Sequence, residues 1–168
     1  GERRALMHDI AFMSAGINIP EGLKVWEVLY VYSQLYEIKN KKQRIDQVIE
    51  LFDLIPYRNY LCRELSIGNK AKVKVAKAFL GNPKLILMDE VTANHDPSVT
   101  EQITTIVKQT CKELKAALLF TSHNMAEVGQ MCSRVIFLNH GKIVAEDTPV
   151  NLVNNLSSSK ITFTLSSD

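Results

Sequence analysis

The apolar residues of the first half of the chain recur at the spacing of amphipathic helices. In the first predicted helix, Lys24 to Ile38, they fall three and four residues apart, at Val25, Val28, Leu29, Tyr32, Leu35 and Tyr36. The same period predicts a second helix over Lys41 to Phe52 and a third over Asn69 to Leu80. Since this period places the apolar side chains on one face of each helix, we expect residues 24–80 to form a helical lobe.

Continuous apolar runs replace this helical spacing in the second half of the chain. Leu85 to Met88 and Ala117 to Thr121 have the character of strands buried on both faces, and Ile10 to Met13 is a shorter candidate. A helix that begins at Pro97, with Asp96 able to cap it, separates the first two strands. This alternation predicts an α/β fold in which a parallel sheet is joined to the helical lobe.

Shorter elements are predicted in the remainder of the chain. A short helix is expected over Met125 to Cys132, and a hairpin is expected from Val135 to Leu138 and from Lys142 to Ala145. A last helix would begin at Thr148 and Pro149, and Lys160 to Leu165 is a candidate strand.

Composition places the chain among ordinary globular domains. Of its 168 residues 46% are apolar and 23% are charged, and the net charge is +2. This balance does not require nucleic acid as a partner, and the predicted basic stripe of Lys70, Lys74 and Lys77 is best interpreted as a solvated helix face. The three widely spaced cysteines form no CxxC pair, which indicates reduced thiols in a cytosolic protein.

Two acids follow the strand predicted at Leu85 to Met88. Asp89 and Glu90 would therefore lie at the carboxyl edge of the sheet, where open α/β sheets bind their ligands. One carboxylate can hold Mg²⁺ there, and the next can orient a water molecule for attack on a phosphate. A solvated acidic turn is the commoner explanation for this short segment taken alone.

Three further positions are candidates because of where they fall. Ser66 and Gly68 open the third predicted helix, and a helix N-terminus presents free N–H groups to an anion, although an ordinary Ser cap explains the same pattern. His123 comes just after the strand Ala117 to Thr121, so it would lie near the end of the acidic strand. A histidine in such a place is more often structural than functional.

Order and spacing together resemble the ATP-binding cassette (ABC) ATPases. LSIGN (65–69) is similar to the signature loop, LILMDE (85–90) to the Walker B strand, ANHDP (93–97) to the D-loop and TSH (121–123) to the His loop. The tail RVIFLNHGKIVAEDTP (134–149) is similar to the closing strands of that family. Each motif alone is weak, but the four in this order are specific.

The resemblance covers about residues 3–155 and implies a single partial P-loop NTPase domain of the ABC type. Its parts would be the end of a core strand with the Q-loop region (1–23), a helical subdomain (24–80), the α/β core (81–155) and a C-terminal extension (156–168).

The resemblance also implies roles for single residues, with ATP as substrate and Mg²⁺ as cofactor. Asp89 would be the acid of the Mg²⁺ site, Glu90 the base that polarises the attacking water, and His123 a contact to the γ-phosphate. A second subunit would complete the site in a head-to-tail dimer. We expect the ATP bound to that opposite subunit to be served by Ser66, Gly68 and Asn69. Asp96 would lie at the dimer seam.

The segment from Ile10 to Ile38 resembles the ABC-2 type exporters, in particular the sodium-extrusion and drug-export branches. This implies a cytoplasmic subunit at the inner face of the cell membrane that powers a separate transmembrane permease. Trp26 and Tyr30 lie off the main apolar stripe of their helix, so they are either core residues or part of a groove for a cytoplasmic helix of that permease.

Several positions depart from the family pattern. No GxxxxGK[ST] phosphate loop is present, since Gly141-Lys142 is followed by Ile143 and preceded by Ile136 where the first Gly belongs. We therefore expect the chain to begin after such a loop, and to be inactive alone. Ser14 to Gly16 lacks the Q-loop Gln, and Ile67 and Asn69 alter the signature.

These departures leave an alternative open. The chain could be a degenerate, non-hydrolysing module that contributes only its signature face to an active partner. A chromosome-maintenance or repair ATPase is less consistent with the sequence, because those proteins insert long coiled coils between the Q-loop and the signature. Here the two are only 50 residues apart, counted from Gly16 to Ser66, and no sustained heptads occur between them.

Overall fold

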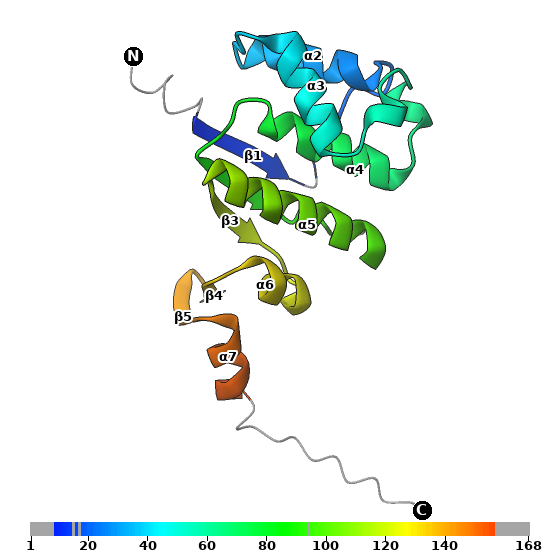
Figure 1. The fold of residues 1–168 in the computed structure, drawn as a ribbon. Coiled ribbons are helices and arrows are strands. Elements are labelled where there is room, and N and C mark those ends of the chain that lie inside the picture. Colours follow the sequence, from blue (N-terminus) through cyan, green and yellow to red (C-terminus); the bar gives the residue numbers. More distant parts are fainter. Residues whose placement is uncertain (1–8, 15, 17, 94, 157–168) are drawn as a thin grey trace, which may run out of the picture. The chain divides into compact units, whose positions relative to one another are not determined.

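The fold is described for residues 9–14, 16, 18–93 and 95–156 of a computed structural model (Figure 1). These residues belong to two compact units, one that extends to His123 and one that begins at Asn124. The first unit holds the helical lobe and a parallel sheet, and the second holds a hairpin and two short helices. No helix in the described part of the chain has both the length and the apolar character needed to cross a bilayer.

Helices dominate the first unit up to residue 80, as the apolar spacing predicts. Its α-helices in the described range 18–80 are α2 (Val25–Leu35), α3 (Lys41–Leu51) and α4 (Ile67–Ala76). Three short 3₁₀ turns accompany them, namely η1 (Ile55–Tyr57), η2 (Cys62–Glu64) and η3 (Lys77–Phe79). The largest side chains that these elements bury completely are Leu29, Ile49, Phe52, Leu54, Phe79 and Leu80.

Backbone geometry moves the helix ends away from their predicted positions. The first helix stops at Leu35 rather than Ile38, because Glu37 adopts a left-handed φ of +53° that cannot continue a helix. The third helix begins at Ile67 rather than Asn69, because Ser66 is its N-cap and its hydroxyl oxygen accepts the Asn69 N–H at 3.2 Å. Apolar spacing could not reveal this start, since Ile67 is exposed.

The sheet has the predicted parallel arrangement. Its strands are β1 (Ile10–Ser14), β2 (Leu85–Asp89) and β3 (Ala117–Thr121), in the spatial order β1-β2-β3. Both pairings are parallel, and helix α5 (Pro97–Leu114) forms the crossover from β2 to β3. The prediction that these three segments are parallel strands of one sheet is confirmed.

One face of the sheet is covered and the other is not. The residues buried on the covered face are Ala11, Met13, Ile86 and Met88. On the opposite face Phe12 is 53% exposed and Leu119 is 60% exposed. The prediction that β2 and β3 are buried on both faces is therefore wrong for the described residues, because double burial requires a covering layer on each side.

The second unit matches its predicted elements. It contains α6 (Met125–Met131), the antiparallel hairpin β4 (Val135–Asn139) and β5 (Lys142–Asp147), and α7 (Pro149–Leu156). The hairpin turn uses positive φ at both central residues, His140 (+46°) and Gly141 (+74°), which suits the twist of the strands. The strand predicted at Lys160 to Leu165 lies outside the described residues.

The basic stripe predicted on the third helix is solvated only in part, and the prediction is wrong for Lys77. Lys77 is only 4% exposed, and its ammonium nitrogen lies 4.7 Å from the centroid of the Tyr32 ring on α2. Burial lowers the pKa of this ammonium group, because the charged form is the one that loses hydration. Lys70 donates to Glu21 at 2.7 Å. The cation–π contact of Lys77 thus joins η3 to α2.

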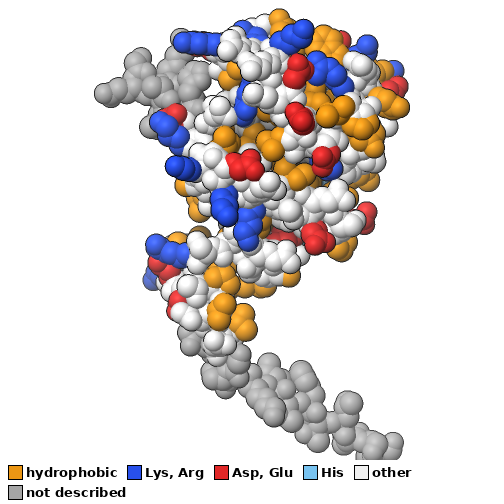
Figure 2. Space-filling model, viewed as in Figure 1, with side chains coloured by type: hydrophobic (Ala, Val, Ile, Leu, Met, Phe, Trp, Pro, Cys, Tyr) orange, Lys and Arg blue, Asp and Glu red, His pale blue; other side chains and the backbone are white. Residues whose placement is uncertain are grey.

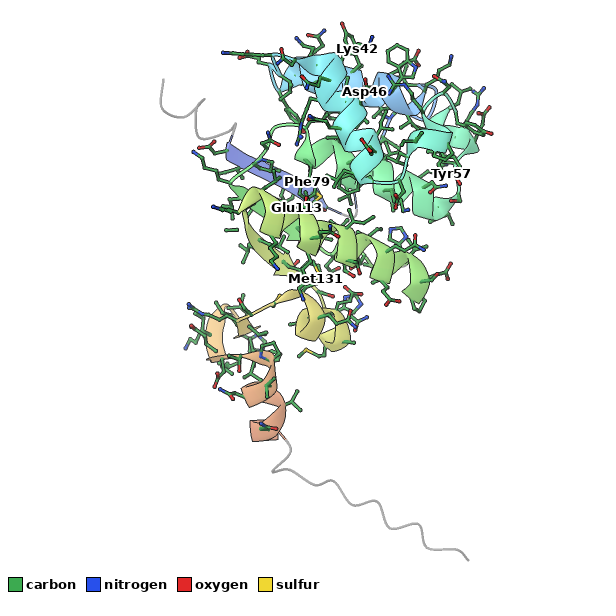
Figure 3. The ribbon with its side chains drawn as sticks, in the orientation of Figure 1. Lys42, Asp46, Tyr57, Phe79, Glu113 and Met131 are labelled. Atoms are coloured by element: carbon green, nitrogen blue, oxygen red, sulfur yellow. The ribbon has the colours of Figure 1, made fainter. Side chains whose placement is uncertain are left out.

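Arg44 joins helix α3 to the same segment. Its guanidinium group donates to the carbonyl oxygens of Phe79 at 2.5 Å and Leu80 at 3.1 Å, at the end of η3. The Phe79 ring also packs against Phe52 at 5.4 Å between centroids, and η3 lies against β1 (Figure 3). The end of η3 is therefore the junction between the helical lobe and the sheet.

Replacing Arg44 by Met tests this junction. Met fills a similar length but removes both donors, so we expect the free energy of unfolding in urea to fall by about 2 kcal/mol. Arg63→Met, at an exposed arginine of η2, is the matched control and should change stability by less than about 0.5 kcal/mol. Equal effects of the two substitutions would show that Arg44 does not hold this junction.

Candidate functional site

The carboxyl edge of the sheet brings Asp89 and Thr121 side by side. Parallel register pairs Ser14 with Asp89 and Asp89 with Thr121 at the ends of β1, β2 and β3. The Thr121 hydroxyl donates to Asp89 Oδ1 at 2.6 Å, and the Thr121 carbonyl oxygen accepts the Glu90 N–H at 3.1 Å. These two bonds fix the Asp89 carboxylate and the backbone of the following residue.

Glu90 leaves the strand in a conformation that is unfavourable for a residue with a side chain. Its φ is +47°, in the left-handed region, where a non-glycine residue is typically strained by about 1 kcal/mol or more. Its carboxylate is half exposed, and Oε1 lies 3.4 Å from Nδ1 of His123. The expectation that His123 lies near the end of the acidic strand is confirmed by this distance, and a shared phosphate ligand for Glu90 and His123 stays a prediction.

The signature residues form a second group, at the first turn of α4. Ser66 is exposed at the N-cap, Gly68 and Asn69 follow it, and Ile67 is 73% exposed beside it. The structure thus gathers Asp89, Glu90 and His123 at the sheet edge, and it gathers Ser66, Gly68 and Asn69 at this helix start. The capping bond from Asn69 shows that Ser66 has a structural role whatever else it does.

Asp96 occupies the N-cap position of α5, but its side chain does not cap the helix. Only its carbonyl oxygen takes part, by accepting the Thr100 N–H at 3.0 Å. The prediction of a side-chain cap is therefore wrong, although Asp96 does occupy the N-cap position. Pro97 at the first helical position already fixes the backbone for the start of the helix. Asp96 is exposed.

Two neighbours of the site were not singled out by sequence reasoning. Thr121 holds Asp89, and its position opposite Asp89 follows from parallel register, which the sequence alone does not determine. His95 has a buried Nδ1 atom with no hydrogen-bond partner. Burial lowers the pKa of His95, and the charge of Lys74 lowers it further. No pattern in the sequence indicated this placement.

The fit of Mg²⁺ to these residues depends on a single carboxylate. Within the described residues no three His, Cys, Asp or Glu side chains cluster as a metal site. Mg²⁺, however, is usually held by one or two carboxylates together with substrate phosphates and water. Asp89, with Oδ1 bonded to Thr121 and its other oxygen available, suits that role, so the donor set fits Mg²⁺ when it arrives with a phosphate ligand.

Comparison with known proteins assigns the family. A family model described as "ABC transporter" matches residues 1–93, and the chain belongs to this family. It is 30% identical over 158 residues to the lipopolysaccharide export system ATP-binding protein LptB of Haemophilus influenzae, covering 89% of this chain and 65% of that protein. It is 31% identical over 147 residues to the methionine import ATP-binding protein MetN of Clostridium tetani, covering 86% and 46%.

Solved structures show the same fold. The structure of cbiO1 from Clostridium perfringens, part of the ABC transporter complex cbiONQ, is similar with a TM-score of 0.80 at 19% identity. That similarity covers 92% of this chain and 62% of cbiO1. A putative metal-chelate type ABC transporter in an inward-facing conformation is similar with a TM-score of 0.76 at 19% identity, covering 89% of this chain and 62% of that one. The predicted fold class, an ABC ATPase domain of the α/β type, is confirmed.

The strained backbone of Glu90 leads to a stability prediction. Glu90→Gly removes the Cβ that makes a positive φ unfavourable, so we expect the free energy of unfolding to rise by about 0.5–1 kcal/mol. Glu90→Ala also loses the carboxylate but keeps the Cβ, and it should bring no such gain. Urea unfolding of the two variants beside the parent decides this. If Glu90→Gly were no more stable to urea than Glu90→Ala, the backbone of Glu90 would not be strained.

Proposed function

We propose that the protein is the nucleotide-binding subunit of an ABC exporter, which couples ATP binding and hydrolysis to transport through a partner membrane permease. The observation that carries this proposal is the meeting of Asp89, Glu90 and His123 at one sheet edge, in a chain of this family. The alternative of a degenerate module is not favoured, because it needs none of these three side chains to be assembled.

In this proposal each residue at the sheet edge has one task. Asp89 would hold Mg²⁺, which when bound would supply positive charge beside the phosphates. Glu90 orients a water molecule and accepts its proton, since its carboxylate is half exposed and reaches into solvent beyond the strand end. His123, 3.4 Å from Glu90, hydrogen-bonds the γ-phosphate.

The signature residues act on a second subunit in the same proposal. Ser66 presents its hydroxyl group to the ATP bound by the opposite subunit, from the first turn of α4 that also holds Gly68 and Asn69. Asp96 lies at the dimer seam. The exposure of Ser66 and Asp96 supports this arrangement. ATP then joins two copies head to tail, and hydrolysis releases them.

The helical lobe is the surface we assign to the permease, on the cytoplasmic side of the membrane. Tyr30 is 43% exposed and its ring lies 6.4 Å from that of the half-buried Trp26, so Tyr30 at least is not a core residue. Figure 2 shows further hydrophobic side chains between charged ones over this lobe. Export rather than import rests on the resemblance of Ile10 to Ile38 to ABC-2 exporters, since relatives named for both directions match this chain.

The nucleotide site also needs a phosphate-binding loop, which these 168 residues do not contain. We infer that such a loop is supplied by sequence outside them, and the protein that includes it is called the extended protein below. The chain spans 65% of LptB and 46% of MetN, which is compatible with this inference.

Glu90→Gln in the extended protein tests the assignment of the base. The amide keeps the shape of the side chain but cannot accept a proton, so ATP turnover should fall by about 10²-fold or more while ATP binding survives. Phosphate release and the binding of a fluorescent nucleotide measure the two quantities. Glu101→Gln, at an exposed glutamate of α5, is the control and should leave both unchanged. Turnover equal to that of the parent would remove Glu90 from the mechanism.

A second experiment concerns the 168-residue chain itself. It should bind Mg–ATP at least about 10²-fold more weakly than the extended protein and should not hydrolyse it, because the backbone N–H groups and the Lys of the missing loop supply most of the phosphate affinity. Isothermal titration of both proteins provides the comparison. Micromolar binding by the short chain would place the phosphate site elsewhere.

A further inference from the structure

Gly68 lies at a point of unusually close approach between two helices. A Cβ atom built on Gly68, in the first turn of α4, would come within 3.0 Å of Val99 Cγ2 and 3.5 Å of Val99 Cγ1. Carbon atoms pack most favourably at about 3.5–4.0 Å, so the nearer of these contacts is repulsive. By contrast, an added Cβ at Gly16, Gly22 or Gly129 would meet nothing within 4 Å. The absence of a side chain at Gly68 therefore has a specific packing consequence.

The partner in this contact belongs to the first turn of α5. Val99 is the third residue of that helix, which begins directly after Asp96. Helices α4 and α5 pack against each other. The start of α4 approaches the first turn of α5 at a point that depends on a glycine.

We propose that Gly68 is a positioning residue, which lets the first turn of α4 pack against Val99 and so holds Ser66 in a fixed relation to Asp96. This inference rests on the proposed function, in which both residues face the opposite subunit. It differs from the role that the family resemblance implies for Gly68, namely direct contact with the phosphate of that subunit's ATP. In the direct-contact account Val99 has no part.

A double-mutant cycle separates these two accounts. Gly68→Ala adds the clashing methyl group, Val99→Ala removes both Cγ atoms, and in the double variant the nearest Val99 atom is the Cβ at 3.9 Å. The variants are made in the extended protein carrying Glu90→Gln, so that ATP is not consumed. Sedimentation with Mg–ATP gives the dissociation constant of the ATP-dependent dimer, and urea unfolding without nucleotide gives the stability of each variant.

We expect Gly68→Ala to weaken the ATP-dependent dimer by about tenfold, the effect typical of forcing one methyl group into a packed site. In the Val99→Ala background, Gly68→Ala should change the dissociation constant of the dimer by no more than about twofold. It should not lower the unfolding midpoint there, because Ala is a better helix former than Gly. Binding of nucleotide to the separated subunits should be the same in all four proteins.

Two results would overturn the proposal. If Gly68→Ala weakens the dimer equally in both backgrounds, the methyl group obstructs the nucleotide and Val99 is irrelevant. If Gly68→Ala has no effect on the dimer in the presence of Val99, the contact does not position the loop. A parent that forms no ATP-dependent dimer would instead refute the proposed function, while the four unfolding midpoints would still report whether Gly68 and Val99 pack as described.

Discussion

The parallel pairing of β2 with its two neighbours is the constraint on which the candidate site depends. Register places Asp89 opposite Thr121. The Thr121 hydroxyl can therefore donate to the Asp89 carboxylate, and the Thr121 carbonyl oxygen can accept the Glu90 N–H. His123 then comes within reach of Glu90 because it is only two residues beyond the end of β3. A slip of one residue would turn the Asp89 side chain to the opposite face and break all of these contacts.

The helical lobe is tied to the same sheet at η3. Lys77 of η3 contacts the Tyr32 ring of α2, and Arg44 of α3 donates to carbonyl oxygens at the end of η3. Phe79 of η3 packs against Phe52 of the lobe. Burying a cation is costly unless its surroundings compensate, and here the Tyr32 ring and the helix-end carbonyl groups do so. Only five residues separate η3 from β2, so the signature helix and the strand that carries Asp89 are joined by a short length of chain.

The sequence predicts those features that depend on local pattern. Apolar runs mark β2 and β3, helical spacing marks α2 and α3, and an acidic pair that follows a strand marks the edge where ligands bind. It does not predict features that depend on distant partners. The burial of Lys77 depends on Tyr32, forty-five residues earlier, and the crowding at Gly68 depends on Val99. The exposed face of β3 likewise could not be foreseen, since an apolar run indicates burial without showing what covers each face.

A crystal structure of the extended protein with Mg²⁺ and a hydrolysis-resistant ATP analogue would test the central claim most directly. The account predicts that Asp89 binds the metal, directly or through water, and that Glu90 and His123 both lie within hydrogen-bond distance of the γ-phosphate or of a water molecule in line with it. A γ-phosphate bound away from this sheet edge, with Glu90 and His123 contacting only each other or solvent, would contradict the account.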